Sequence, residues 1–106
     1  MRTRSETDTF REAIKQYGEA NQLIVLFEEM SELQKEVCKS IRYNKRQLKP
    51  KIAEELADVE IMLEQLKIIF DIDDDVEGWR LDKVVRLKEN LGLIERGGDE
   101  RYAGNR

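Results

Sequence analysis

The stretch KIAEELADVEIML, from Lys51 to Leu63, decides the predicted fold because its apolar side chains recur at helical spacing. At about 100° per residue, Leu56 and Val59 share one face of a helix, and Glu55 falls inside the same face. Asp58 lies at the edge of that face. A carboxylate at a core position is costly unless it is paired or bound to a metal ion. The stretch therefore predicts an amphipathic helix that turns acids toward its core.

A second stretch, LFEEMSELQKE from Leu26 to Glu36, has a similar acidic edge. Glu29 and Glu36 border its predicted apolar face, and Glu32 follows on the far side of Glu29. The apolar stripe expected here consists of Leu26, Met30, Leu33, Val37 and Ile41. The stripe expected on the later helix consists of Ile52, Leu56, Val59, Leu63, Leu66 and Phe70, widened by Met62 and Ile69.

The remaining helix signals predict an all-α fold, a small bundle of about four helices. Thr7 or Asp8 is the expected N-cap of a first helix that stops near Gly18. Pro50 suits the first turn of the helix that follows the connection YNKRQLKP. The expected helices after the first are residues 19–42, 50–70 and 76–95. Together they form one predicted domain over residues 1–96, followed by a flexible tail over residues 97–106.

Composition excludes several classes of function. The chain has 106 residues and a net charge of −4, so a globally basic nucleic-acid surface is not expected. No apolar run approaches the ~20 residues of a membrane-spanning helix, and the first residues lack the apolar core of a secretory signal. Cys38 is the single cysteine, which fits a reducing compartment. We therefore expect a cytoplasmic protein without membrane or nucleic-acid partners.

The acids fall into two pairs at a spacing of three, Glu29 with Glu32 and Glu55 with Asp58. If the two helices form an antiparallel hairpin, residue 29 lies level with 58 and residue 32 with 55. A loop centred nearer Arg46 would shift this register by about one helical turn and add Glu36 as a fifth ligand. The chain contains no histidine, so a metal bound here would be oxygen-ligated, with Mg²⁺ expected and Mn²⁺ as the alternative.

The two-part motif resembles that of the MazG-type all-α nucleoside triphosphate pyrophosphohydrolases. It reads E-E-x-x-E from Glu28 to Glu32 and, after 22 further residues, E-x-x-D from Glu55 to Asp58. The resemblance covers roughly residues 17–70 well and the fourth helix loosely. It implies Mg²⁺-dependent hydrolysis between the α and β phosphates, which yields the nucleoside monophosphate and pyrophosphate.

The resemblance also implies roles for individual residues. Glu28 is the expected catalytic assistant, which orients or deprotonates the attacking water. Lys83 and Arg86 are expected at the phosphates, although exposed solubilising charges explain them equally well. Members of the family often have an asparagine just before this lysine, and here Asp82 stands there. The expected metal ligands are Glu29, Glu32, Glu55 and Asp58, and the expected substrate-binding residues are Lys51, Lys83, Arg86 and Gln22.

Other interpretations of the same residues stay open. Gln22 is equally consistent with a polar residue on the helix surface, and Trp79 with a packing anchor. The basic connection around Arg46 is expected to steer an anionic substrate toward the acidic site. A phosphoribosyl-ATP pyrophosphatase or a dUTP/dCTP-specific enzyme is a related alternative. A non-enzymatic helical interaction protein, whose acids are only surface charge, is the alternative from another class.

The predicted helices leave apolar surface that one hairpin does not cover. Leu23, Ile24 and Phe27 lie away from the acidic edge of the second helix, and Ile61 and Ile68 do likewise on the third. A chain of this length also buries only a thin core. We therefore expect a homodimer or homotetramer that completes the core, and the resembled family forms such assemblies as well.

Overall fold

The computed structural model describes residues 2–44 and 46–97, and within them the chain is helical and contains no strand. The four α-helices of these residues are α1 (Arg4–Tyr17), α2 (Glu19–Tyr43), α3 (Lys49–Phe70) and α4 (Asp73–Asn90), with a short 3₁₀-helix at Arg46–Leu48. The predicted all-α class is confirmed. None of these helices combines the length and the apolar character that crossing a membrane would require.

The chain divides into two compact units, Met1–Asp71 and Ile72–Arg106. The first unit contains α1, α2 and α3, and the second contains α4. The predicted domain over residues 1–96 spans both units and stays a prediction. Of the predicted tail over residues 97–106, residues 98–106 lie outside the described part of the chain.

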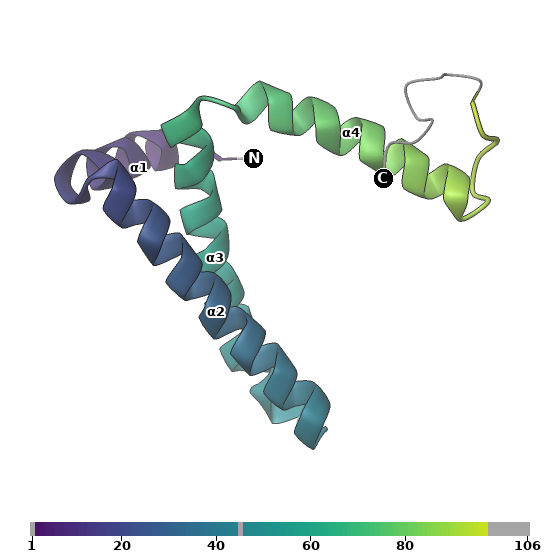
Figure 1. Cartoon of the computed structure of the whole chain (residues 1–106), viewed down its shortest axis with the longest axis horizontal. Coiled ribbons are helices and arrows are strands. Elements are labelled where there is room, and N and C mark those ends of the chain that lie inside the picture. Colours follow the sequence, from purple (N-terminus) through teal and green to yellow (C-terminus); the bar gives the residue numbers. More distant parts are fainter. Residues whose placement is uncertain (1, 45, 98–106) are drawn as a thin grey trace. The chain divides into compact units, whose positions relative to one another are not determined.

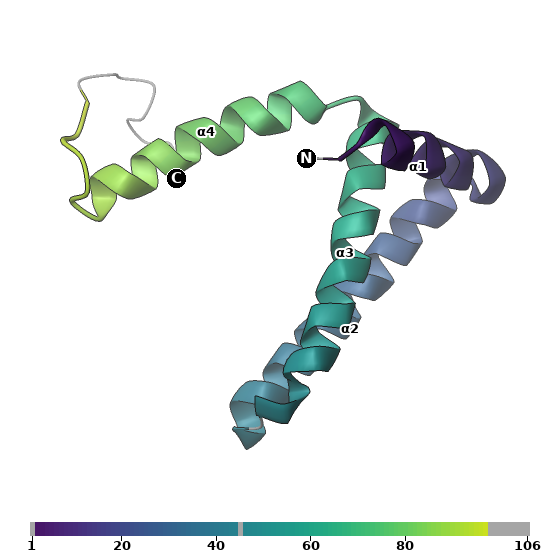
Figure 2. The same cartoon turned by 180° about the vertical axis from the view of Figure 1, so that it is seen from behind.

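In the first unit, α2 and α3 run antiparallel and side by side, and α1 packs against both near the end at which α2 begins and α3 ends (Figures 1 and 2). Asn44 caps α2 in the left-handed conformation at φ 50°, which reverses the chain toward α3. Asparagine tolerates this conformation better than most residues. Pro50 stands in the first turn of α3, as predicted.

The start of α1 differs from the prediction. Its N-cap is Thr3, whose hydroxyl accepts a hydrogen bond from the Glu6 backbone N–H at 3.1 Å. The Glu6 carboxylate accepts in turn from the Thr3 backbone N–H at 3.0 Å. This is a capping box. Its sequence signature, T-x-x-E from Thr3 to Glu6, lies before the predicted caps Thr7 and Asp8. The predicted stop at Gly18 is correct, since Gly18 has φ 90°, a conformation that favours glycine.

The α2–α3 interface is more polar than the sequence pattern predicted. Its buried apolar residues are Leu26, Val59 and Met62, whereas Gln22, Glu36, Glu55 and Gln65 are buried polar residues. Several residues of the predicted apolar stripes are instead exposed, so those parts of the stripes are wrong for the single chain. These residues are Met30, Val37, Ile41, Leu56 and Phe70.

The helix predicted over residues 76–95 begins and ends earlier in the structure. The aspartates 73–75, which precede the predicted start, form the first turn of α4, where negative charge interacts favourably with the helix dipole. The helix ends at Asn90 rather than near Glu95. Gly92 has φ 75° and donates its N–H to the Glu89 carbonyl, while the Leu93 N–H reaches the Lys88 carbonyl. This Schellman pattern, with Gly92 in the left-handed conformation, terminates the helix.

An ion-pair network joins the N-terminus of the first unit to α3. The Arg2 guanidinium donates to the Glu64 carboxylate at 2.6 Å and to the Thr7 hydroxyl at 3.0 Å. Lys67 donates to the other Glu64 oxygen at 2.7 Å. Burial raises the pKa of the Glu64 carboxyl, but the hydrogen bonds and charges of Lys67 and Arg2 outweigh it and lower the pKa below its usual value.

We expect Glu64→Gln to lower the free energy of unfolding by about 1–2 kcal/mol at pH 7, because it removes two charge-assisted hydrogen bonds. The folded-state pKa is depressed, so this stabilisation is present above the unfolded value of 4.5 and disappears as the pH falls through the folded-state pKa. Urea unfolding of the wild type and the variant at pH 7 and pH 3 measures the difference.

The matched control for Glu64→Gln is Glu60→Gln, because Glu60 lies one turn earlier on α3 and is exposed. Equal stability of the two variants at pH 7 would contradict the role of the network. A Glu64→Gln deficit that persists unchanged at pH 3 would contradict the charge-based explanation.

Candidate functional site

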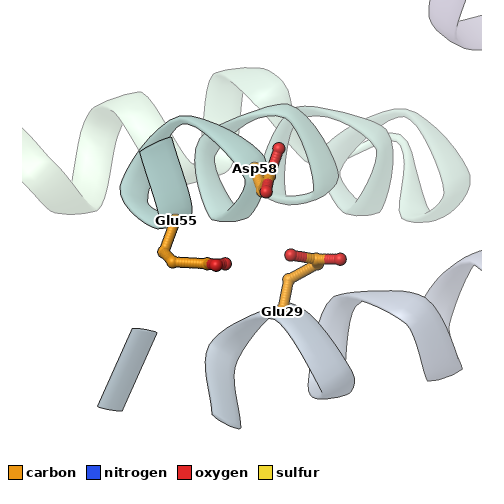
Figure 3. Close-up of side chains that lie close together, drawn as sticks. All are labelled: Glu29, Glu55 and Asp58. Carbon is orange, nitrogen blue, oxygen red and sulfur yellow. The ribbon is translucent and has the colours of Figure 1, made fainter. Parts of the chain in front are cut away.

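Three carboxylates converge between α2 and α3. Glu29 extends from α2 and Glu55 and Asp58 from α3, so that one carboxylate oxygen of each lies within 4.8 Å of the others (Figure 3). The Glu55 side chain is only 8% exposed, and Glu29 and Asp58 are half-buried. We call these three residues the carboxylate triad. It unites the second acid of the E-E-x-x-E motif with both acids of the E-x-x-D motif.

Helical periodicity explains why these acids meet. Gln22 and Glu29 are seven residues apart on α2, and Asp58 and Gln65 are seven residues apart on α3, so each pair shares one helix face. Gln22 donates its side-chain amide to the Gln65 carbonyl oxygen at 2.7 Å, and both residues are buried. This contact sets residue 22 against residue 65, which keeps the predicted register of 29 opposite 58.

Glu32, the remaining predicted ligand, is exposed and does not belong to the triad. Three residues along an α-helix rotate a side chain by roughly 60° away from the starting face, whereas seven residues return it to within about 20°. The face that begins at Gln22 therefore continues through Glu29 to Glu36. Glu36 is accordingly buried, and its carboxylate lies 3.5 Å from the Lys39 ammonium rather than in the triad.

The electrostatics of the triad favour a counter-ion. Burial raises the pKa of the Glu29 carboxyl, and the charges of Asp58 and Glu55, a hydrogen bond with Asp58 and the charge of Glu32 raise it further. The ammonium of Lys51 lies 3.1 Å from Glu55 and supplies one positive charge to the group. The carboxylates of the triad repel one another, and a cation bound between them would relieve this repulsion and stabilise their ionised form.

The donor set fits a hard divalent cation. Carboxylate oxygens are the preferred protein ligands of Mg²⁺, which is usually held by one or two carboxylates and keeps several waters. Glu29, Glu55 and Asp58 supply such ligands from two rigid helices, without the histidine or cysteine that zinc would favour. Glu29 and Asp58 are half-buried, so solvent reaches two of the three ligands. These residues therefore fit the predicted Mg²⁺, and they would fit Mn²⁺ equally well.

The other predicted site residues of the first unit differ in their surroundings. Glu28 precedes the triad residue Glu29 and is exposed. Lys51 is 47% exposed and contacts Glu54 at 3.4 Å as well as Glu55. Gln22 is buried, so its amide binds Gln65 rather than facing solvent. Gln22 would meet a nucleotide only if the contact between the two amides opened.

Lys83 and Arg86 belong to α4 in the second unit. The Lys83 ammonium lies 5.7 Å from the centre of the Trp79 ring, within the range of a cation–π contact. Arg86 is half-buried, and its Nε and Nη2 atoms have no hydrogen-bond partner in the described part of the chain. Both cations stay predicted phosphate contacts.

Sequence reasoning did not identify Gln65 as part of this interface. A signal for it was present, because Gln22 and Gln65 satisfy the same antiparallel register as Glu29 and Asp58.

Comparisons with models of known families, with curated proteins and with solved structures give no match. The chemistry of the site therefore rests on its own residues.

Proposed function

We propose that the protein is a Mg²⁺-dependent nucleoside triphosphate pyrophosphohydrolase, which cleaves between the α and β phosphates. The observation that carries the proposal is the carboxylate triad, because two separate acidic motifs supply it from two helices. The same two motifs carry the resemblance to the MazG-type enzymes. Surface charge alone would not require Glu55 to be buried in the interface, where Val59 and Met62 of the same helix are also buried.

Each group has a defined task in the proposed reaction. A Mg²⁺ ion bound at the triad would neutralise phosphate charge and make a coordinated water a better nucleophile. Glu29, Glu55 and Asp58 would hold the ion, and Glu32, which is exposed on α2, stays a proposed fourth ligand. Glu28 is exposed and precedes Glu29 in the chain, and its proposed role is to accept a proton from the attacking water.

Cations are proposed to bind the phosphates. Lys51 lies beside the triad, where an ammonium would offset the negative charge of a bound triphosphate. For Lys83 and Arg86 on α4, a phosphate contact is proposed from the sequence resemblance alone. The substrate is a nucleoside triphosphate or its deoxy form. The proposed role is removal of unwanted nucleotides from the cytoplasmic pool.

Purified protein incubated with mixed nucleoside triphosphates and Mg²⁺ is expected to release inorganic pyrophosphate. Glu55→Gln should lower the rate by at least about 100-fold, because it removes a ligand and a charge from the triad. Glu60→Gln is the matched control, since Glu60 is an exposed acid on the same helix outside the triad. No release with any nucleotide, or equal rates for the two variants, would contradict the proposal.

Self-association is proposed on separate grounds. Along α2, the single chain leaves Ile24 56%, Phe27 62% and Ile41 77% exposed, and Leu56 on α3 is exposed as well. Isolated apolar residues on a surface are ordinary, but a series along one helix marks an interaction surface. A homodimer or homotetramer would cover these side chains and enlarge the thin core.

Sedimentation velocity at micromolar concentration is expected to give a mass of at least two chains. Phe27→Glu should shift the distribution toward the monomer, because it places a charge in the proposed contact. A wild-type protein that sediments as a monomer would contradict association.

A further inference from the structure

Lys51 and Glu55 form an unequal ion pair beside the triad. The Glu55 side chain is 8% exposed and fixed between two helices, whereas the Lys51 side chain is 47% exposed. Their ammonium and carboxylate lie 3.1 Å apart at a spacing of four residues on α3. The exposed partner can therefore leave the contact by rotating its own side chain, while the carboxylate stays in place.

The carboxylate that Lys51 holds is the same one that a divalent cation would need. Glu55 contributes a ligand oxygen to the triad, so an ammonium beside it and a metal ion within the triad are two positive charges competing for one acid. An ammonium and a divalent cation that contact the same carboxylate are like charges and repel each other. A Lys51 ammonium at the Glu55 carboxylate therefore weakens the binding of a divalent cation there, and a bound cation weakens the contact with Lys51.

We propose that Lys51 is a displaceable counter-ion of this site: its ammonium holds Glu55 in the metal-free protein, and a divalent cation releases it to bind a phosphate group. This inference rests on the metal site of the proposed function and adds the order in which the metal ion and the substrate bind. The metal ion binds first, and the lysine becomes available to the anionic substrate afterwards. Lys51 thus links metal occupancy to phosphate binding.

A second ion pair in the same interface provides a matched control. Lys39 is 45% exposed and lies 3.5 Å from Glu36, whose side chain is also 8% exposed. Glu36 is buried like Glu55 but does not belong to the triad. Lys51→Met and Lys39→Met therefore remove the same charge from similar surroundings, and only the first removes a competitor for the metal ion.

The test is calorimetric titration of Mn²⁺ into metal-free wild type and both variants. Lys51→Met is expected to bind Mn²⁺ roughly threefold to fivefold more tightly than wild type, the upper part of the range that a partly exposed ion pair supports. Lys39→Met should stay within about twofold. At saturating Mg²⁺, inorganic pyrophosphate should bind Lys51→Met several-fold more weakly than Lys39→Met. The expected result is that Lys51→Met, but not Lys39→Met, gains affinity for Mn²⁺ and loses affinity for pyrophosphate.

Each contrary result has its own meaning. If wild type binds Mn²⁺ and Lys51→Met binds it no more tightly than Lys39→Met, the displacement is wrong while the metal site stands. If Lys51→Met binds Mn²⁺ more tightly but pyrophosphate unchanged, release toward the phosphate is wrong. If neither wild type nor Lys51→Met binds Mn²⁺, the metal site of the proposed function is overturned together with this inference.

Discussion

The interface between α2 and α3 places carboxylates where helices of this kind usually place apolar side chains. Glu55 and Glu36 are buried there, and Glu29 and Asp58 are half-buried beside them. Desolvating an ionised carboxylate costs several kcal/mol unless a positive charge or hydrogen bonds compensate it. Glu55 and Glu36 each have one partly exposed lysine. The uncompensated negative charge therefore destabilises the interface, and a bound cation would stabilise it by neutralising that charge.

The rest of the first unit keeps this interface in register. The contact between the Gln22 and Gln65 side chains fixes the two helices axially, because a buried amide without its partner would be costly. Arg2 and Lys67 both pair with Glu64, which ties the N-terminal segment to α3. The triad lies between these contacts and the chain reversal at Asn44. Rigid helices on both sides suit a site that must hold several ligands at fixed positions.

The sequence predicted the two long helices of the first unit and all three residues of the triad. Helical periodicity located α2 and α3 within one residue at each end, and the paired motifs predicted the antiparallel register of Glu29 and Asp58. Glu32 was assigned with Glu29 because a spacing of three keeps two residues near one face. A spacing of three nevertheless turns Glu32 about 60° away from Glu29, and Glu32 is exposed. Glu36, seven residues after Glu29, is the next acid that is buried against α3, although it lies outside the triad.

The remaining differences come from tertiary packing and local capping. An apolar stripe predicts which residues can be buried, but not which face a partner helix covers, so Met30, Val37 and Ile41 were assigned to the core of one chain. Local capping sets the end of α4, because Gly92 adopts the left-handed conformation and the helix ends before the predicted Glu95.

The central claim is that Glu29, Glu55 and Asp58 bind one divalent cation. Paramagnetic broadening of backbone amide signals by substoichiometric Mn²⁺ tests this claim most directly, because it locates the ion along the chain. We expect broadening centred on residue 29 of α2 and residues 55–58 of α3, and its loss in Asp58→Asn. Broadening centred on the aspartates 73–75 of α4, or unchanged by Asp58→Asn, would contradict the account.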